Sequence, residues 1–234
     1  MRKAGQLINE LIRERRLASN RSKPIGAGGN GIVYASDVPG NVIKQTHIPD
    51  GTFGRTLTDE ADLQAVAADL GFAPRVVGLE RFPGGVGNRL EMADARNNYE
   101  RVATSATGAA GAAGEGFPVD PSIRIKTAQQ QGMLALKGIR LEDRRSANIM
   151  QHKMTGRPLQ LDFGIADKMS PDQQAAWLAE VTAEGFEAAG IGEMGSILRA
   201  TVMDYLEGGD VAEAMDIAKQ GFSRLQKIKT PLQV

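Results

Sequence analysis

The sequence predicts an α+β protein in two parts, a small β-rich region over residues 1–93 and a mainly helical region over residues 94–234. Short runs of apolar and β-branched residues, separated by glycine-containing turns, indicate strands in the first part. Longer segments with apolar residues at helical spacing dominate the second part. Within the second part, residues 105–118 consist almost entirely of Gly, Ala, Ser and Thr, which is typical of a flexible linker or a mobile loop.

The first part opens with an expected helix over residues 4–18, where apolar residues recur at helical spacing. A hairpin is expected over residues 23–44, because two apolar runs flank the turn-forming stretch 37–40. Residues 58–70 again show a helical pattern, with Thr58 as the expected N-cap and a glycine directly after the last residue. Two further strands complete the first part: residues 74–79 and 89–92.

The second part contains a predicted helix over residues 122–138 and then a hairpin with short strands at 149–150 and 159–161. From Ser170 onward the chain has a helical pattern to its end. Ser170 followed by proline is a favourable helix start, because proline suits the first helical position. Glycine-rich patches predict breaks in this helical region at two places: residues 190–195 and 208–209.

Composition excludes several classes of function. Lys plus Arg and Asp plus Glu number 28 each, so the net charge near zero predicts neither a nucleic-acid partner nor a membrane partner. The absence of cysteine excludes disulfides, thiolate chemistry and Cys-ligated metals, and two histidines make a zinc site improbable. No apolar run approaches the ~20 residues of a membrane span, and the first residues lack the apolar core of a signal peptide. We therefore expect a cytoplasmic protein.

The first motif with chemical meaning spans residues 26–33 and fits G-x-G-x-x-G-x-V, formed by Gly26, Gly28, Gly31 and Val33. Glycines let the backbone approach phosphate groups closely. The same glycine pattern opens a helix in dinucleotide-binding folds, whereas here a β-branched run follows it, so that interpretation is disfavoured. Alone, the motif is explained equally well as a glycine-rich turn.

Two further motifs lie in the second part. Asp143 and Asn148 are five residues apart, and Asp162 begins the tripeptide Asp-Phe-Gly. The hairpin expected between them brings the amide of Asn148 and the carboxylate of Asp162 side by side. Oxygen ligands of this kind suit Mg²⁺, which keeps several waters and uses few protein ligands. Asp143 can then face a substrate hydroxyl.

In this order and spacing, the three motifs resemble those of the protein-kinase superfamily, over roughly residues 24–167. The resemblance implies a bilobal protein-kinase-like fold with a reduced C-lobe, and ATP and Mg²⁺ as cofactors. It implies that Gly26, Gly28 and Gly31 cover the ATP phosphates and that Val33 also contacts the cofactor. It also makes Lys44 the lysine that contacts the α- and β-phosphates, and Glu60 its ion-pair partner.

The resemblance implies roles for five more residues. Met92 falls where the linker between lobes borders the adenine. Asp143 resembles the catalytic base that accepts the substrate proton, and Arg145 falls where many members carry a lysine that steadies the γ-phosphate. Asn148 and Asp162 resemble the magnesium ligands.

The sequence also departs from conventional protein kinases. Leu141 and Glu142 precede Asp143, where regulated members carry His-Arg, and that arginine commonly binds an activating phosphate. No Ala-Pro-Glu follows the Asp-Phe-Gly tripeptide, and only residues 165–234 come after it. These features favour a minimal, atypical kinase or a relative of the aminoglycoside and choline kinases.

Three hypotheses therefore stay open. The leading one is a kinase that transfers the γ-phosphate of ATP to Ser or Thr of a protein. The missing peptide-docking motif favours a small hydroxylated substrate, whereas the lack of an acidic cluster for cationic substrates weakens that alternative. A pseudokinase with a binding or structural role is the third, and the intact Lys44, Asp143, Asn148 and Asp162 speak against it.

Overall fold

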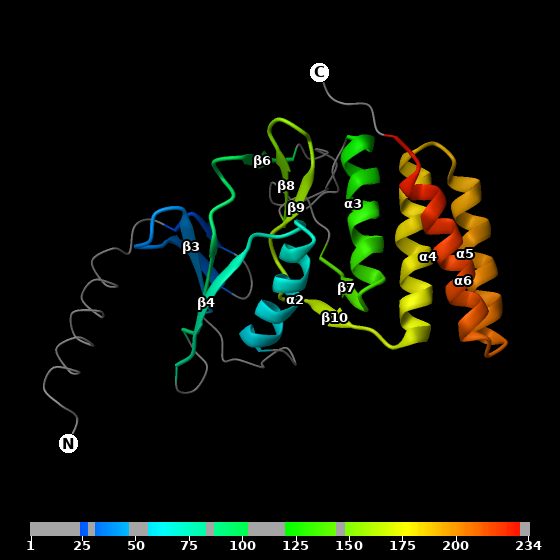
Figure 1. The fold of residues 1–234 in the computed structure, drawn as a ribbon, viewed down its shortest axis with the longest axis horizontal. Helices are drawn as coiled ribbons and strands as arrows, with labels where there is room; N and C mark the ends of the chain where they lie inside the picture. Colours follow the sequence, from blue (N-terminus) through cyan, green and yellow to red (C-terminus); the bar gives the residue numbers. More distant parts are fainter. Residues whose placement is uncertain are drawn as a thin grey trace, which may run out of the picture. The chain divides into compact units, whose positions relative to one another are not determined.

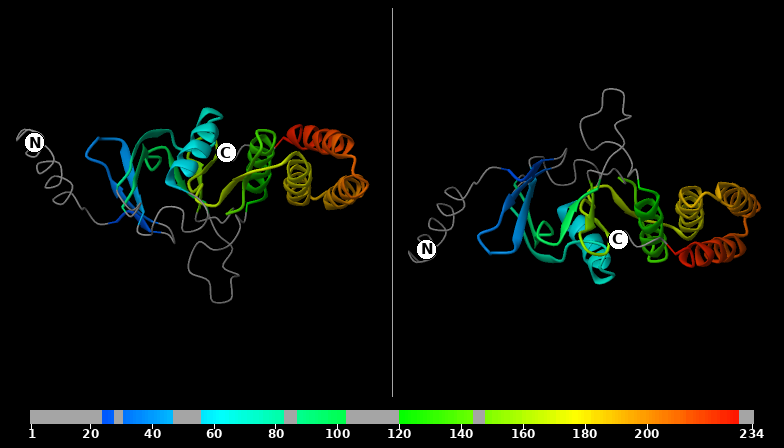
Figure 2. Two further views of the ribbon diagram at one scale, coloured as in Figure 1. Left: turned by 90° about the horizontal axis from the view of Figure 1, so that it is seen from below. Right: turned by 90° about the horizontal axis from the view of Figure 1, so that it is seen from above.

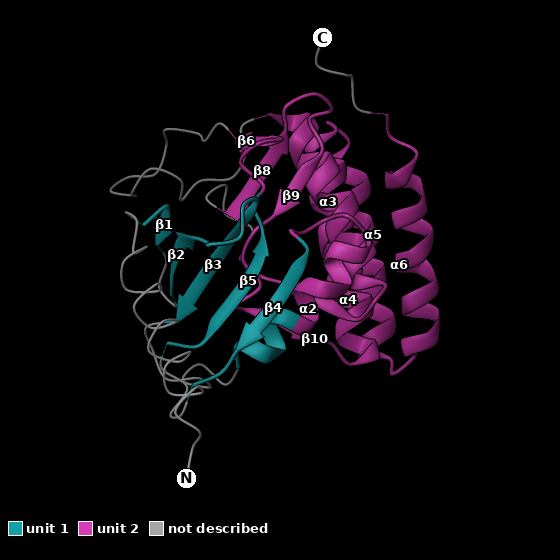
Figure 3. Cartoon of the chain, turned by 60° about the vertical axis from the view of Figure 1, so that its left-hand side comes forward, with its two compact units in different colours: residues 1–61, 75–94 teal, residues 62–74, 95–234 magenta. Residues whose placement is uncertain are grey.

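The structure, a computed structural model, describes six stretches of the chain: residues 24–27, 31–46, 56–82, 87–102, 120–143 and 148–229. The chain divides into two compact units, coloured in Figure 3. Unit 1 comprises Met1–Ala61 and Arg75–Asp94, and unit 2 comprises Asp62–Pro74 and Ala95–Val234. The helix expected over residues 4–18 and the linker expected over residues 105–118 lie outside the described residues.

Unit 1 contains a five-stranded antiparallel sheet with the order β1-β2-β3-β5-β4. Gly40, with a φ of 83°, turns the chain between β2 and β3, as the glycine of the predicted turn requires. The hairpin and the two later strands predicted from the sequence are thus confirmed. The strands are β1 (Gly26–Ala27), β2 (Gly31–Ala35), β3 (Asn41–Thr46), β4 (Val76–Glu80) and β5 (Arg89–Ala93).

The core of unit 1 follows from the alternation of side chains along β3. Every second residue of this strand, beginning with Val42, is buried, so one face of the sheet is covered. The cover is the first turn of helix α2 (Leu57–Asp69), which packs Leu57 and Ala61 against Val42, Leu90 and Met92. Of α2, only the residues up to Ala61 belong to unit 1.

Helix α2 begins one residue earlier than the sequence predicted, and its N-cap is Thr56 rather than Thr58. The Asp59 backbone N–H donates to Thr56 Oγ1 at 3.2 Å, and the Thr56 N–H donates to Asp59 Oδ2 at 2.9 Å. This reciprocal pair of hydrogen bonds requires an acidic or amide residue three positions after the N-cap. Asp59 stands three positions after Thr56, whereas Ala61 stands three positions after Thr58. The helix ends as predicted before Gly71, whose φ is 71°.

Unit 2 contains two small antiparallel sheets in addition to its helices. The hairpin predicted after Asn148 is present as β8 (Ile149–His152) and β9 (Pro158–Gln160), and β6 (Tyr99–Arg101) extends it. A two-stranded ladder joins β7 (Ile139–Leu141) to β10 (Ala166–Lys168). The sequence did not predict β6, β7 or β10.

The two-stranded ladder lies over a buried phenylalanine. Phe163 is 0 % exposed, and its cluster holds apolar residues of α2, of the following loop and of β7 and β10. The buried members are Leu63, Ala67, Ala73, Leu134, Ile139, Leu141, Phe163 and Ala166. The Asp-Phe-Gly tripeptide is therefore anchored in unit 2 through its apolar member.

Four helices form the larger core of unit 2 and lie side by side in Figures 1 and 2. Asp120 caps the first by accepting the Ser122 N–H at 2.7 Å, and the second begins at Pro171, as predicted. The predicted breaks are confirmed, although the first is shorter than expected because Gly192 already belongs to a helix. The helices are α3 (Pro121–Ala135), α4 (Pro171–Ala188), α5 (Gly192–Glu207) and α6 (Val211–Gln226). Within the described part of the chain, no helix is long and apolar enough to cross a membrane.

Glycines inside these helices allow the close packing. A Cβ on Gly132 would lie 2.0 Å from the Phe222 ring, and one on Gly195 would lie 2.8 Å from the Ala183 Cα. The second contact is with backbone, which a side-chain rotation cannot relieve. Close packing thus outweighs the helix-propensity cost of these glycines, about 1 kcal/mol each.

We expect Gly195→Ala to lower the free energy of unfolding by about 1–3 kcal/mol, because α5 must move away from α4. Gly192→Ala in the same helix is the matched control, since its Cβ would make only an ordinary contact, 3.7 Å from the Glu187 Cα. Urea denaturation followed by far-UV circular dichroism measures both. Equal stabilities of the two variants would contradict the packing explanation.

Candidate functional site

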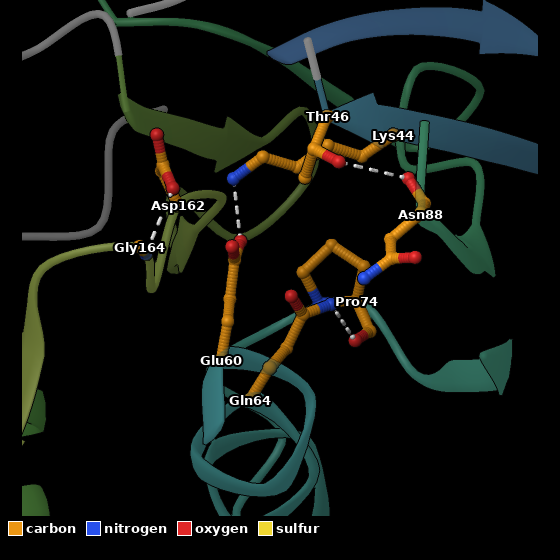
Figure 4. A network of polar contacts seen from close by, with 8 residues as sticks. All are labelled: Lys44, Thr46, Glu60, Gln64, Pro74, Asn88, Asp162 and Gly164. Carbon is orange, nitrogen blue, oxygen red and sulfur yellow. Dashed lines mark hydrogen bonds and ion pairs between the residues drawn. The ribbon is translucent and has the colours of Figure 1, made fainter. Parts of the chain in front are cut away.

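The most distinctive polar contact of unit 1 is an ion pair between β3 and α2. Lys44 Nζ donates to Glu60 Oε1 at 2.5 Å, and the two residues are 7 % and 5 % exposed (Figure 4). Strand alternation directs Lys44 to the face that α2 covers. The packing of Leu57 and Ala61 on that face brings Glu60 to the lysine. The sequence prediction that these two residues pair agrees with this geometry.

Because both side chains are buried, the free energy of this ion pair includes a large desolvation cost. Removing both charges from water costs several kcal/mol each, and their attraction offsets this only with close, well-formed geometry. Lysine and glutamate are almost never fully buried without a partner. Each side chain is therefore locked in position by the other, and the ammonium group has a fixed location beside the sheet.

Three further hydrogen bonds involve Asn88 or Gln64 and were not predicted from the sequence; Figure 4 draws two of them. At the end of β3, Thr46 Oγ1 donates to the Asn88 carbonyl at 3.4 Å, while Asn88 Oδ1 accepts the Phe82 N–H at 2.7 Å. In unit 2, Gln64 Nε2 donates to the Pro74 carbonyl at 2.9 Å. Neither Asn88 nor Gln64 lies in a recognisable motif, so no sequence signal pointed to them.

The glycine motif contains residues with different structural needs. Gly31 pairs with Thr46 across β2 and β3, and a Cβ on it would lie 2.7 Å from the Gln45 carbonyl oxygen. Gly26 pairs with Val33, and a Cβ there would meet only an ordinary contact at 3.8 Å. The sheet therefore requires glycine at Gly31 and not at Gly26. Gly28 lies outside the described residues.

Val33 and Met92 lie on the same sheet face as Lys44. Val33 is directly opposite Lys44 in the β2–β3 ladder, and Met92 is opposite Val42 in the β3–β5 ladder. Met92 is 6 % exposed and belongs to the core of unit 1. The structure places it inside β5, which continues to Ala93, and its role beside the adenine stays a prediction.

The carboxylate and amide motifs belong to unit 2. The Leu161 N–H donates to the Asn148 carbonyl at 2.9 Å, so Asn148 and Asp162 leave the same end of the β8–β9 hairpin. Asp162 Oδ1 accepts the Gly164 N–H at 3.0 Å, which orients its carboxylate (Figure 4). Asp143 follows β7 by two residues. Arg145 lies outside the described residues.

The donor set at this hairpin end fits a magnesium ion. A carboxylate and a side-chain amide supply oxygen ligands, and Mg²⁺ completes its shell with water and phosphate oxygens. Over the described residues, no group of three or more His, Cys, Asp or Glu could hold a metal ion.

No family model and no curated protein matches the chain. Among solved structures, it is similar to the kinase PK-1 of Cydia pomonella granulovirus, with a TM-score of 0.49, 14 % identity, and coverage of 77 % of this chain and 74 % of that one. It is also similar to a mutant PknI kinase domain of Mycobacterium tuberculosis, with a TM-score of 0.42, 20 % identity, and coverage of 70 % and 71 %.

The described elements themselves confirm the predicted fold class. An antiparallel sheet occupies the first region, and a mainly helical region follows.

We expect Gly31→Ala to destabilise the β2–β3 ladder by about 1–3 kcal/mol, because the new Cβ collides with backbone. Gly26→Ala, from the same motif, should leave the ladder intact. Hydrogen exchange at the amides of β2 and β3 measures the difference. Equal protection in both variants would show that Gly31 is not required by the sheet.

We expect Lys44→Met to lower the free energy of unfolding by about 3–5 kcal/mol, because Glu60 remains buried without its partner. The double variant Lys44→Met with Glu60→Met should recover most of this loss, since an apolar pair of similar volume carries no desolvation cost. Urea denaturation of the three proteins measures both effects. A double variant as unstable as the single one would contradict the assigned cause.

Proposed function

We propose that the chain is an ATP- and Mg²⁺-dependent phosphotransferase, most specifically a minimal atypical kinase that phosphorylates Ser or Thr of a protein. The observation that carries the proposal is the buried ion pair between Lys44 and Glu60. The residues of unit 2 that resemble magnesium ligands and a catalytic base support it.

The ion pair favours a function because its two buried charges carry a desolvation cost that an apolar pair at the same positions would not carry. Apolar residues at both positions would join β3 to α2 at lower cost, since buried ion pairs often stabilise less than apolar pairs of similar volume. A buried lysine held at a fixed point is, however, well suited to meet a phosphate group, because its ammonium is already oriented and partly desolvated. Lys44 is then the residue that binds the α- and β-phosphates of ATP.

Asn148 and Asp162 would hold the magnesium ion. When bound, Mg²⁺ neutralises charge on the transferring phosphate groups. The bond between Asp162 Oδ1 and the Gly164 N–H, with the buried Phe163 between them in sequence, keeps that carboxylate in one orientation. The hydrogen bond from the Leu161 N–H to the Asn148 carbonyl holds Asn148 beside the residue that precedes Asp162.

Asp143 would orient the acceptor hydroxyl. In the transfer, the hydroxyl oxygen forms a bond to the γ-phosphorus while the bond between that phosphorus and the β,γ-bridging oxygen breaks, and ADP departs. The hydroxyl proton passes to the Asp143 carboxylate. Phosphoryl transfer of this kind depends on positioning and charge neutralisation more than on covalent help from the protein.

A kinase for a small hydroxylated molecule is the second candidate. Its support is that residues 165–234, which contain α4, α5 and α6, lack an Ala-Pro-Glu sequence. A pseudokinase would bind nucleotide without transfer. The retention of Lys44, Asp143, Asn148 and Asp162 favours an active enzyme over this third possibility.

We expect Asp143→Asn to lower kcat by about 10²–10⁴-fold, because the hydroxyl loses its proton acceptor. Its Mg-ATP binding should persist, seen as stabilisation by about 2.7 kcal/mol when ligand is at 100 times its Kd. Asp204→Asn, on an exposed position of α5, is the matched control and should behave as the native protein. Transfer of labelled phosphate and thermal unfolding with Mg-ATP measure the two properties.

The same assay identifies the acceptor. Labelled ATP is supplied with a mixture of protein substrates in one arm and with aminoglycosides and choline in the other. Label on Ser or Thr of protein supports the protein-kinase proposal, and label on small molecules alone replaces it with the second candidate. Mg-ATP stabilisation without transfer in either arm would identify a pseudokinase, and no stabilisation at all would overturn the nucleotide site.

A further inference from the structure

A second charged cluster lies beside the unit 2 motifs and was not assigned by the sequence analysis. Arg140 of β7 is directly opposite Asp167 of β10. Its Nη2 lies 2.7 Å from Glu142 Oε1 and 3.4 Å from Asp167 Oδ2. The guanidinium also lies over the ring of Trp177 in α4, 5.9 Å from the ring centre. Here we call Arg140, Glu142 and Asp167 the arginine clamp.

The clamp lies on one face of a very short ladder. β7 and β10 pair over three residues each, with Leu141 and Ala166 buried in the Phe163 cluster on the other face. Arg140 and Glu142 share the clamp face because side chains alternate along a strand. A ladder this short presents few backbone hydrogen bonds, so side-chain contacts across it have a large share in holding β10 to β7.

The two ends of the clamp adjoin the proposed catalytic residues. Glu142 directly precedes Asp143, and Asp167 lies five residues after Asp162. One guanidinium therefore links the segment that carries the proposed base to the segment that carries a proposed magnesium ligand. All of these residues belong to unit 2.

We propose that Arg140 is a positioning residue that fixes the segment after Asp162 against β7, so that the chain needs no phosphate to order this segment. The proposal rests on the proposed function for its effect on catalysis. In the protein-kinase superfamily, which the motifs resemble, regulated members use an arginine just before the catalytic aspartate to bind an activating phosphate. In this chain Glu142 takes that place, and the nearby cation is already paired with two carboxylates of the fold.

The clamp predicts a loss of turnover without a matching loss of substrate binding. Arg140→Met should lower kcat by about 10–100-fold, as expected when catalytic groups shift by an ångström, while KM for ATP stays nearly constant. Arg140→Lys keeps the charge and should recover part of the rate. Arg199→Met, which breaks the comparable exposed ion pair with Glu180, is the matched control and should leave kcat unchanged.

A double-variant cycle separates the clamp from the packing of Arg140 on Trp177. If the contact with Asp167 matters, Asp167→Asn should lower kcat by itself and add little in the Arg140→Met background. Full additivity of the two effects would overturn the clamp. An unchanged kcat in Arg140→Met would overturn it as well.

Hydrogen exchange tests the clamp without relying on activity. The Ala166 N–H donates to the Phe163 carbonyl at 3.0 Å, and the Met169 N–H donates to the Gly138 carbonyl at 2.8 Å. Both amides should exchange at least tenfold faster in Arg140→Met than in Arg199→Met. Unchanged protection would overturn the clamp. Faster exchange in a protein that transfers no phosphate would support the clamp and refute the proposed function instead.

Phosphatase treatment tests independence from phosphate. The native protein, incubated with a broad-specificity phosphatase that is then removed, should keep its initial rate of transfer to the acceptor. Loss of activity after this treatment, restored by incubation with ATP, would show that a phosphate orders the segment and would overturn the proposal.

Discussion

The buried contact between Lys44 and Glu60 is the constraint on which unit 1 depends. Neither charge is tolerable there without the other, so β3 and α2 must meet in one register. A slip of β3 by one residue would turn Lys44 to the opposite face of the sheet, away from Glu60. The apolar contacts of Leu57 and Ala61 bring the helix to the sheet, whereas the ion pair selects a single alignment.

Unit 2 uses an apolar anchor for the same purpose. Phe163 is enclosed by Leu141, Ala166 and the later half of α2, and its two sequence neighbours carry the polar functions. Because the ring cannot leave its cluster without exposing a large apolar surface, Asp162 and Gly164 are held where the backbone leaves the core. Precision in a polar site can thus come from a hydrophobic residue between the polar ones.

Elements with strong local patterns were predictable from the sequence, and elements defined by distant partners were not. The β2–β3 hairpin has a turn and two apolar runs of its own, and the helices of unit 2 have clear starts and glycine breaks. In contrast, β6 pairs with β8 about fifty residues later, and each strand of the β7–β10 ladder is only three residues long. Strands this short show no periodicity in the sequence. The cluster of Arg140, Glu142 and Asp167 at the β7–β10 ladder could therefore not be predicted from the sequence either.

The glycine motif and the buried Lys44 differ in how strongly they indicate phosphate binding. The glycine pattern combines two causes, since the sheet itself demands glycine at Gly31 and makes no such demand at Gly26. A buried polar residue distinguishes better between a requirement of the fold and a requirement of the function. The close backbone approach of β2 and β3 accounts for Gly31, whereas an apolar pair could join β3 to α2 at lower cost than the buried lysine and its glutamate do. The stronger argument for phosphate chemistry therefore comes from Lys44, whose burial costs free energy, and not from the glycine motif over residues 26–33.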